Sequence, residues 1–156
     1  MTAGRSDKQG RAVQIVLADD DVEDRMLTLD AFRESRLSNP VHCVEDGEEL
    51  MDYLLHRGRY AAPGVAPRPA LILLDLNMPR MDGREALKAI KSDPSLRTIP
   101  VVVLTTSKAE EDVLRTYELG VNSFVVKPVT FDGLVAAVRA LGEFWFQVVD
   151  LPPSGT

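Results

Sequence analysis

The sequence predicts an α/β fold, a doubly wound parallel sheet of five strands with five helices on its two faces. Two observations indicate this class. Apolar runs alternate with helical patterns along the whole chain, which is the order of elements in a parallel sheet covered by helices. The runs, such as LILL at residues 71–74, do not alternate between apolar and polar residues, as expected of strands buried on both faces. The 156 residues suffice for one domain with a full core.

Each element has local support in the sequence. The expected strands are apolar runs at residues 13–18, 41–44, 70–74, 99–104 and 123–126. The expected helices have apolar residues at helical spacing, at about residues 23–35, 50–55, 84–91, 108–119 and from 130 or 132 onward. Between them, Asp21 is a candidate helix cap, Gly120 suits a helix C-terminus, and Pro94 stops the helix before it. Thr130 and Asp132 are alternative caps of the last helix.

Composition excludes several classes of protein. The formal net charge of -6, without a basic stripe, argues against a nucleic-acid partner. The single cysteine, Cys43, rules out an intramolecular disulfide and fits a reducing cytoplasm. No apolar segment has the length of a membrane span, and the polar residues 1–12 lack a signal core. We therefore expect a cytoplasmic protein with no membrane contact and a disordered segment at residues 1–12.

Polar side chains stand where the predicted strands end. Asp19 and Asp20 follow the first strand, Asp75 the third, Thr105 the fourth and Lys127 the fifth. The carboxyl ends of parallel strands share one edge of a sheet, where ligands bind. Carboxylates gathered there repel by about 4 kcal/mol at 4 Å and an effective dielectric near 20, so they favour a hard cation such as Mg²⁺. A lysine and a hydroxyl beside them suit phosphoryl oxygens, and a carboxylate can itself be the nucleophile.

Simpler explanations exist for each feature taken alone. Acidic residues at a helix start interact favourably with the helix dipole, which would account for Asp19 and Asp20 as caps. Asp75 alone could be a turn residue. His42 and His56 lack metal-ligand spacing, and we interpret both as structural. The combination of four strand ends favours a site over these explanations.

Four motifs together resemble the receiver domain of two-component response regulators. They are ADDD at residues 18–21, LLDLNMPRMDG at 73–83, LTTS at 104–107 and VVKP at 125–128. The resemblance implies a flavodoxin-like receiver fold over residues 13–143, with strand order 2-1-3-4-5. It also implies a role in a phosphorelay, in which a histidine kinase supplies a phosphoryl group.

The resemblance implies a role for each acidic candidate. Asp75 would be the phosphoacceptor. Mg²⁺ would be held by Asp20, by Asp75 and by the backbone carbonyl of Asn77, while Asp19 would act through a bound water.

The remaining motif residues would serve the phosphoryl group and the switch. Thr105 and Lys127 would contact phosphoryl oxygens, and Thr105 is preferred over the adjacent Thr106 by its spacing to Lys127. Thr105 and Phe124 would form the conformational switch, since Phe124 lies where the family carries its rotating aromatic residue.

Three further segments resemble the single-domain regulators that partner bacterial phytochromes, which are light-sensing histidine kinases. They are the loop after HRGRY (residues 56–60), the phrase KSDPSLRTIPVVVLTTSKAEEDV at 91–113, and the ending EFWF…LPPSGT. This resemblance implies a phytochrome kinase as phosphodonor, docking on the first helix around Arg25 and Met26.

The end of the chain has more apolar residues than one core-facing stripe requires. Leu134, Val138, Leu141 and Trp145 form such a stripe. The extension at residues 144–156 begins with further aromatic residues, and exposing them would leave a large apolar patch. They could fold back on their own domain. We predict instead a homodimer whose contact residues are Leu141, Phe144, Trp145 and Phe146.

The sequence favours a phosphoacceptor switch that is not an enzyme, although it would assist its own phosphorylation and slow autodephosphorylation. One alternative is a magnesium-dependent phosphohydrolase. Such enzymes carry a second carboxylate two residues after the nucleophile, where this chain has Asn77. The other alternative is a receiver-like binding module that is never phosphorylated, and such modules lose the acidic pair or the lysine.

Overall fold

Five strands form one parallel sheet in the order β2-β1-β3-β4-β5. The computed structural model describes residues 14–35, 40–76, 78, 80–105, 123–126 and 130–141, with the backbone alone at residues 105 and 123–126. The strands are β1 (Ile15–Ala18), β2 (Val41–Val44), β3 (Leu71–Asp75), β4 (Val101–Thr105) and β5 (Ser123–Val126). The predicted fold class and strand order are confirmed.

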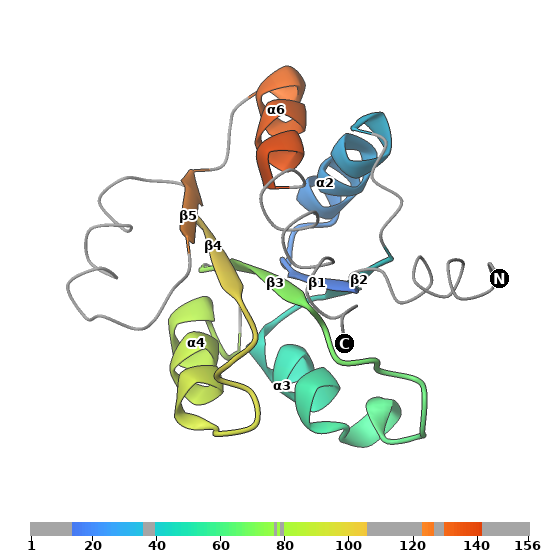
Figure 1. Ribbon diagram of the computed structural model, residues 1–156, viewed down its shortest axis with the longest axis vertical. Helices are drawn as coiled ribbons and strands as arrows, with labels where there is room; N and C mark the ends of the chain where they lie inside the picture. The colour runs from blue at the N-terminus through green and yellow to red at the C-terminus, as the bar shows by residue number, and fades with distance from the viewer. Residues whose placement is uncertain are drawn as a thin grey trace, which may run out of the picture.

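Helices cover both faces of the sheet (Figure 1). The α-helices in the described residues are α2 (Val22–Glu34), α3 (Gly47–Leu55), α4 (Gly83–Ser92) and α6 (Phe131–Leu141). Helices α2 and α6 lie on one face, and α3 and α4 lie on the other (Figure 1). A short 3-10 helix, η1 (Gly58–Tyr60), follows α3 and was not predicted. The helix predicted at 108–119 lies outside the described residues.

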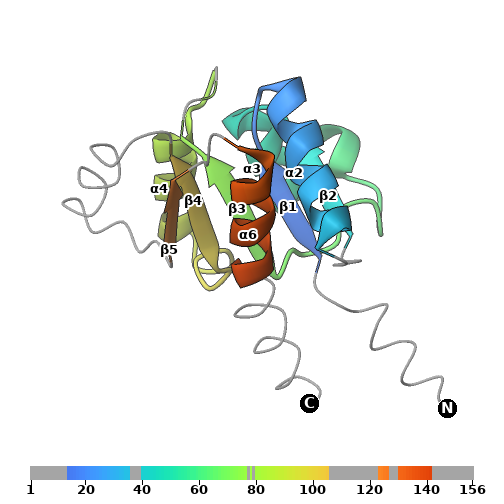
Figure 2. The ribbon, with the colours of Figure 1, turned by 90° about the horizontal axis from the view of Figure 1, so that it is seen from above.

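Alternate residues of each central strand pack against opposite helix layers, as the pleat of a strand requires. In β1, Ile15 and Leu17 belong to the cluster under α2 and α6, whereas Val16 and Ala18 belong to the cluster under α3 and α4. Full burial of such a side chain stabilises the fold by about 1.5–3 kcal/mol. Helices α2 and α6 lie side by side over their cluster (Figure 2). The unbroken apolar runs are therefore explained by burial on both faces.

The helices begin at residues that cap them. The side-chain oxygen of each cap accepts a backbone N–H three residues later, at Asp21, Asp46, Asp82 and Thr130. Asp82 and Glu85 form a reciprocal capping box at the start of α4. Helix α2 thus begins one residue earlier than predicted, directly after Asp21. Of the two alternatives for α6, Thr130 is the cap.

The register of the sheet aligns the carboxyl ends of the strands. Ala18 pairs with Leu74, Asp75 with Leu104, and Thr105 with Val126. The residues that follow β1 and end β3 therefore lie next to one another at a single edge.

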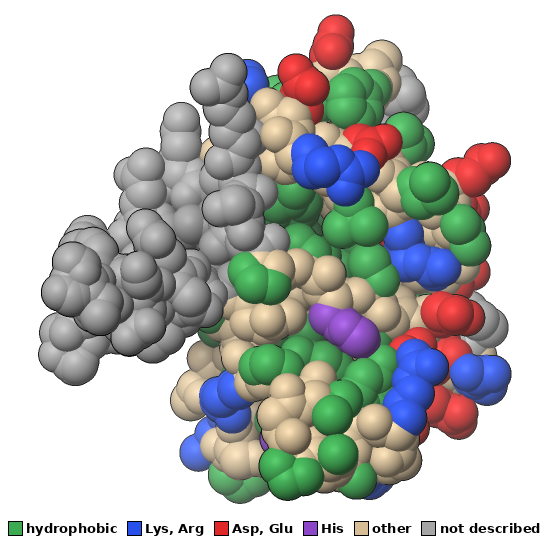
Figure 3. All heavy atoms as spheres, turned by 90° about the vertical axis from the view of Figure 1, so that its right-hand side faces the viewer, with side chains coloured by type: hydrophobic (Ala, Val, Ile, Leu, Met, Phe, Trp, Pro, Cys, Tyr) green, Lys and Arg blue, Asp and Glu red, His purple; other side chains and the backbone are tan. Residues whose placement is uncertain are grey.

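Charged side chains are spread over one face of the molecule (Figure 3), and the described helices are too short or too polar to span a membrane. On the face that carries the β2 edge, acidic and basic side chains are interspersed with apolar ones (Figure 3). The formal charge of -6 is therefore not gathered into a single patch on that face. None of the helices in the described ranges has the length and apolar character needed to cross a membrane.

Candidate metal centre

Three aspartates meet at the carboxyl edge of the sheet. One carboxylate oxygen from each of Asp19, Asp20 and Asp75 lies within 4.8 Å of the other two. Asp19 is fully buried and Asp75 is 4% exposed, whereas Asp20 is exposed to solvent. Two buried carboxylates beside a third give a concentrated negative charge with one side open to solvent.

The connection from β1 to α2 holds the first part of this cluster. The Asp19 carboxylate accepts a hydrogen bond from the backbone N–H of Asp21 at 3.0 Å. The Arg25 guanidinium reaches back from α2 and donates to the backbone carbonyl of Asp19 at 2.7 Å. The loop that carries Asp19 and Asp20 is thus tied to the first turns of α2. The positive end of the α2 dipole also lies next to the cluster and stabilises negative charge there.

Asp75 is held by the strand itself. It is the last residue of β3, with Leu73 and Leu74 buried before it. The loop that follows is closed by a hydrogen bond from the N–H of Gly83 to the carbonyl of Leu76 at 3.0 Å. A Cβ at Gly83 would lie 2.3 Å from the backbone oxygen of Asp75, so only glycine permits this closure. The first residue of α4, Gly83, is therefore in direct contact with the backbone of Asp75.

The cluster fits a hard divalent cation. In an octahedral Mg²⁺ site with metal–oxygen distances of about 2.1 Å, neighbouring ligand oxygens are about 3 Å apart and opposite ones about 4.2 Å apart. The three aspartate oxygens lie within 4.8 Å of one another, which is close enough for Asp20 and Asp75 to bind one cation directly and for Asp19 to reach it through a water. Asp19, Asp20 and Asp75 were all predicted from the sequence, and the structure brings them together.

Other predicted site residues cannot be placed with this cluster. Asn77 and Lys127 lie outside the described residues. For Thr105 and Phe124 the backbone alone is described: Thr105 ends β4 and Phe124 lies within β5. Their proposed contacts stay predictions.

Of the four predicted dimer residues, only Leu141 lies within the described chain. Leu141 is buried in the cluster formed with α2 and the sheet, so it belongs to the core of a single chain. Residues 144–146 lie outside the described residues.

Two features near the site were not foreseen. Arg25, placed on a docking surface by the sequence, also bonds the backbone of Asp19. Arg80, in the loop after β3, forms an ion pair with the buried Asp46 at the start of α3. That pair joins residues 34 positions apart, and no local pattern could have indicated it.

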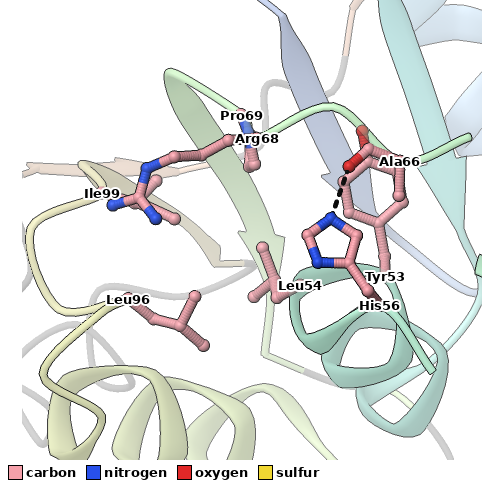
Figure 4. Close-up of a pocket in the computed structure, with 8 residues that line it drawn as sticks. All are labelled: Tyr53, Leu54, His56, Ala66, Arg68, Pro69, Leu96 and Ile99. Atoms are coloured by element: carbon pink, nitrogen blue, oxygen red, sulfur yellow. Dashed lines mark hydrogen bonds between the residues drawn. The ribbon is translucent and has the colours of Figure 1, made fainter. Parts of the chain in front are cut away.

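A pocket lies at the amino ends of β3 and β4, the edge of the sheet opposite to the carboxyl edge (Figure 4). It has a volume of about 90 Å³, and its lining residues are Tyr53, Leu54, His56, Ala66, Arg68, Pro69, Leu96 and Ile99. Its polar groups bind the surrounding backbone: His56 Nε2 lies 2.9 Å from the carbonyl of Ala66, and Arg68 donates to the carbonyl of Ser95 at 2.8 Å. These bonds hold the loop before β3 in place, which supports a structural role for His56.

The fold and the acidic cluster define a class of protein. The chain belongs to the response regulator receiver domain family, whose model matches residues 15–139. The family and fold expected from the four motifs are therefore confirmed.

Relatives of known structure make the comparison more specific. Response regulator Rcp1 of Synechocystis sp. is 40% identical over 147 residues, which are 94% of this chain and 98% of Rcp1. The structure of the Mn²⁺-bound form of Rcp1 matches with a TM-score of 0.77 at 41% identity, over 90% of this chain and 99% of that one.

Two other structures are similar. The phosphorylated cyanobacterial phytochrome response regulator RcpA gives a TM-score of 0.78 at 44% identity, over 88% of this chain and 96% of that one. The bacteriophytochrome response regulator RtBRR gives 0.75 at 48% identity, over 86% and 80%. The chain is thus a receiver domain homologous to phytochrome response regulators.

Proposed function

We propose that this receiver accepts a phosphoryl group on Asp75 from a phosphohistidine of a kinase, with Mg²⁺ as the cofactor. The observation that carries the proposal is the meeting of Asp75 with Asp19 and Asp20 at the open edge of the sheet. A carboxylate oxygen of Asp75 forms a bond to phosphorus as the bond from phosphorus to the histidine nitrogen breaks. The electron pair of that bond stays with the imidazole.

Mg²⁺ would be held by Asp20, Asp75 and the backbone carbonyl of Asn77, with Asp19 acting through water. When bound, it neutralises charge on the carboxylates and on the phosphoryl oxygens. The metal-bound form of Rcp1 contains Mn²⁺, a cation with the same preference for oxygen ligands, which supports a divalent cation here. Thr105 and Lys127 would donate to phosphoryl oxygens, and Thr105 with Phe124 would change conformation in response.

The likeness to phytochrome response regulators supports a phytochrome histidine kinase as the phosphodonor. The exposed face of α2 supports docking next to the acidic cluster, because Val22 and Met26 are 56% and 59% exposed one helical turn apart. An apolar pair of this kind beside charged Arg25 suits a partner helix.

The chain would act as a phosphoacceptor and not as a turnover enzyme, apart from slow loss of its own phosphoryl group. The segments assigned from the sequence are a disordered stretch at residues 1–12, the receiver at 13–143 and a dimerisation segment at 144–156. The aromatic residues after α6, whose last core residue is Leu141, support pairing of two chains.

The test is intact-protein mass after incubation with acetyl phosphate and Mg²⁺. We expect the wild-type chain to gain one phosphoryl group and Asp75→Asn to gain none. Omission of Mg²⁺ should prevent the gain in the wild type. If the wild type gains no mass while binding Mg²⁺, the chain acts as a phosphorylation-independent binding module.

A further inference from the structure

Arg80, in the loop that follows Asp75, has an unusual backbone conformation. Its φ is 63°, in the left-handed region that side chains with a Cβ rarely adopt. Among the described residues other than glycine, only His56 shares this sign of φ, and His56 ends α3 as a left-handed helix cap. Arg80 caps none of the helices in the described part of the chain. Unusual backbone conformations that persist need contacts that hold them.

Those contacts come from the start of α3. The Arg80 guanidinium donates through Nη2 to Oδ2 of Asp46, and its Nε lies 3.4 Å from Oε1 of Glu48. Asp46 is 2% exposed, and its other oxygen accepts the N–H of Glu49 at 2.8 Å as the cap of α3. One buried carboxylate therefore caps a helix and binds Arg80 at the same time.

The backbone next to this ion pair is also in direct contact with α3. The N–H of Gly47 donates to the carbonyl of Met81 at 2.8 Å. A Cβ at Gly47 would lie 2.3 Å from that same oxygen, so the first turn of α3 and the loop touch without room for a side chain. The loop after Asp75 is thus joined to α3 through Met81, and the start of α4 is joined through Gly83 to Leu76, the residue that follows β3.

We propose that Arg80 and Asp46 are positioning residues for the metal centre: their ion pair fixes the loop that directly continues Asp75, and so holds the acidic cluster ready for a cation. This rests on the proposed function. A ligand set that is ordered before the metal arrives loses less conformational freedom on binding. Partners hydrogen-bonded directly to metal ligands change metal affinity about 10–100-fold, and Arg80 and Asp46, which act through the backbone of the loop, are expected at the lower end of that range.

The sign of the effect separates positioning from simple electrostatics. Arg80 is a cation, and removing a positive charge near an acidic cluster can only favour the binding of Mg²⁺. Loss of positioning has the opposite result and weakens binding. A weaker affinity in an Arg80 variant therefore cannot come from the lost charge. Asp46→Asn removes a negative charge, which by itself weakens Mg²⁺ binding, so the Arg80 variants decide the question.

The experiment measures the Mg²⁺ dissociation constant of the full chain by calorimetry at fixed ionic strength. Arg80→Gln and Asp46→Asn each remove the ion pair, and asparagine keeps the cap of α3. We expect both to raise the dissociation constant about tenfold, and the double variant to be no weaker than either. Arg80→Lys should recover part of the affinity. Arg57→Gln is the matched control, because it removes an exposed arginine paired with Asp52 at the far end of α3.

A second readout needs no metal. In the metal-free protein, hydrogen exchange at the amides of Gly47 and Gly83 should be faster in Arg80→Gln than in Arg57→Gln. Arg80→Gly is a second variant that removes the ion pair without backbone strain, since glycine adopts φ near 63° readily, so it controls for misfolding of Arg80→Gln. It should remain folded, with melting near the wild type, and still bind Mg²⁺ more weakly.

Three outcomes would overturn the inference. The first is an unchanged or tighter dissociation constant in Arg80→Gln. The second is wild-type affinity in Arg80→Gly beside weak binding in Arg80→Gln, which would assign the effect to backbone strain and not to the ion pair. The third is a wild type that binds no Mg²⁺, which fails the proposed metal site and the inference together, whereas the first two leave the proposed function intact.

Discussion

Carboxylates of this chain differ in what surrounds each one. Asp46 is buried and bound by Arg80 and by the first turn of α3. Asp19 is buried too, and accepts a backbone N–H. Asp20 is exposed beside Asp19 and Asp75, so it adds charge to the cluster from the solvent side. Each of these surroundings leads to a different response to substitution.

Replacing Asp20 with Asn should stabilise the metal-free protein, because it removes one charge from three that lie within 4.8 Å. The repulsion between two such charges is about 1 kcal/mol in surroundings like water and about 3.5 kcal/mol at an effective dielectric of 20. For a chain of this size, each kcal/mol corresponds to about 2–4 °C in melting temperature. We expect a rise of this order in thermal unfolding without metal, and no further rise when Mg²⁺ is added. An unchanged melting temperature without metal would contradict a repulsive cluster.

His42 lies in a polar and aromatic cluster away from the metal centre. The hydroxyl of Tyr60 donates to Oε2 of Glu49 at 2.6 Å, so its oxygen accepts from Nε2 of His42 at 2.9 Å. The ring of Tyr53 packs against the imidazole of His42, with ring centroids 5.0 Å apart, and the Arg59 guanidinium lies over the ring of Tyr60. Burial, followed by the charge of Arg59, lowers the pKa of His42 below its usual 6.5.

This lowered pKa predicts a pH dependence of stability. Below about pH 6.5 the unfolded chain binds a proton at His42 that the folded chain resists. The contribution of His42 is therefore complete above pH 6.5 and is lost as the pH falls below it. Urea unfolding between pH 7.5 and 5.5 should show a steeper loss of stability in the wild type than in His42→Gln. Equal losses in the two proteins would show that other groups account for the dependence.

At the scale of elements, helix starts determine where the loops of the site lie. Asp21, Asp46 and Asp82 each end a loop at the carboxyl edge and begin a helix. A glycine directly follows two of these caps. Gly47 is in close contact with Met81, in the loop that carries Arg80, and Gly83 is in close contact with the backbone of Asp75 and Leu76. The described parts of these loops are therefore in direct contact with the helix starts.

Replacing Gly83 with Ala should destabilise the protein, because the new Cβ would meet the backbone oxygen of Asp75 at 2.3 Å and Cα of Leu76 at 2.6 Å. Overpacking against backbone atoms costs about 1–3 kcal/mol, which is a fall of several degrees in thermal unfolding. Since Asp75 must move, Mg²⁺ affinity should fall as well.

Gly64→Ala is the control for Gly83. Gly64 has a φ of 82°, but a Cβ there would meet no atom within 4 Å, so alanine is disfavoured by the left-handed backbone alone, by about 1 kcal/mol. It should leave Mg²⁺ binding unchanged. Equal effects of the two substitutions on binding would contradict a specific contact at Asp75.

At the scale of the whole molecule, the parallel register converts distant sequence positions into one site. The pairing of Ala18 with Leu74 brings the residue after β1 beside the last residue of β3. The two helix layers bury both faces of the sheet, so its carboxyl edge is where polar chemistry can be placed. Register and layering together therefore account for the place of the metal centre.

Replacing Trp145 and Phe146 with serine should convert a dimer to a monomer, because apolar aromatic residues beyond α6 would be exposed in a single chain. Light scattering after size exclusion would give the mass in solution. Val65→Ser, which removes a 47% exposed apolar side chain from a loop, is the control and should leave the mass unchanged. A wild-type mass equal to that of the double variant would disprove the proposed dimer.

Much of this protein could be predicted from local sequence. The apolar runs indicated all five strands, and the caps at Asp21 and Thr130 were among the candidates, because periodicity and capping involve residues a few positions apart. The acidic residues at the strand ends were predicted for the same reason. Leu134 was assigned to the core stripe, yet it is only partly buried, and Val135 takes the buried position.

Periodicity and capping patterns do not predict contacts between segments that are far apart in the sequence. The sequence by itself determined the five strands, the four α-helices of the described residues, the family and the residues with the right chemistry for a metal centre. The tertiary structure alone decided that Asp19, Asp20 and Asp75 come within 4.8 Å, that Leu141 is buried, and that Arg80 pairs with Asp46. The physical reason is that such contacts depend on strand register and on helix packing. Both are determined by many small packing energies distributed over the whole core, which no local pattern contains.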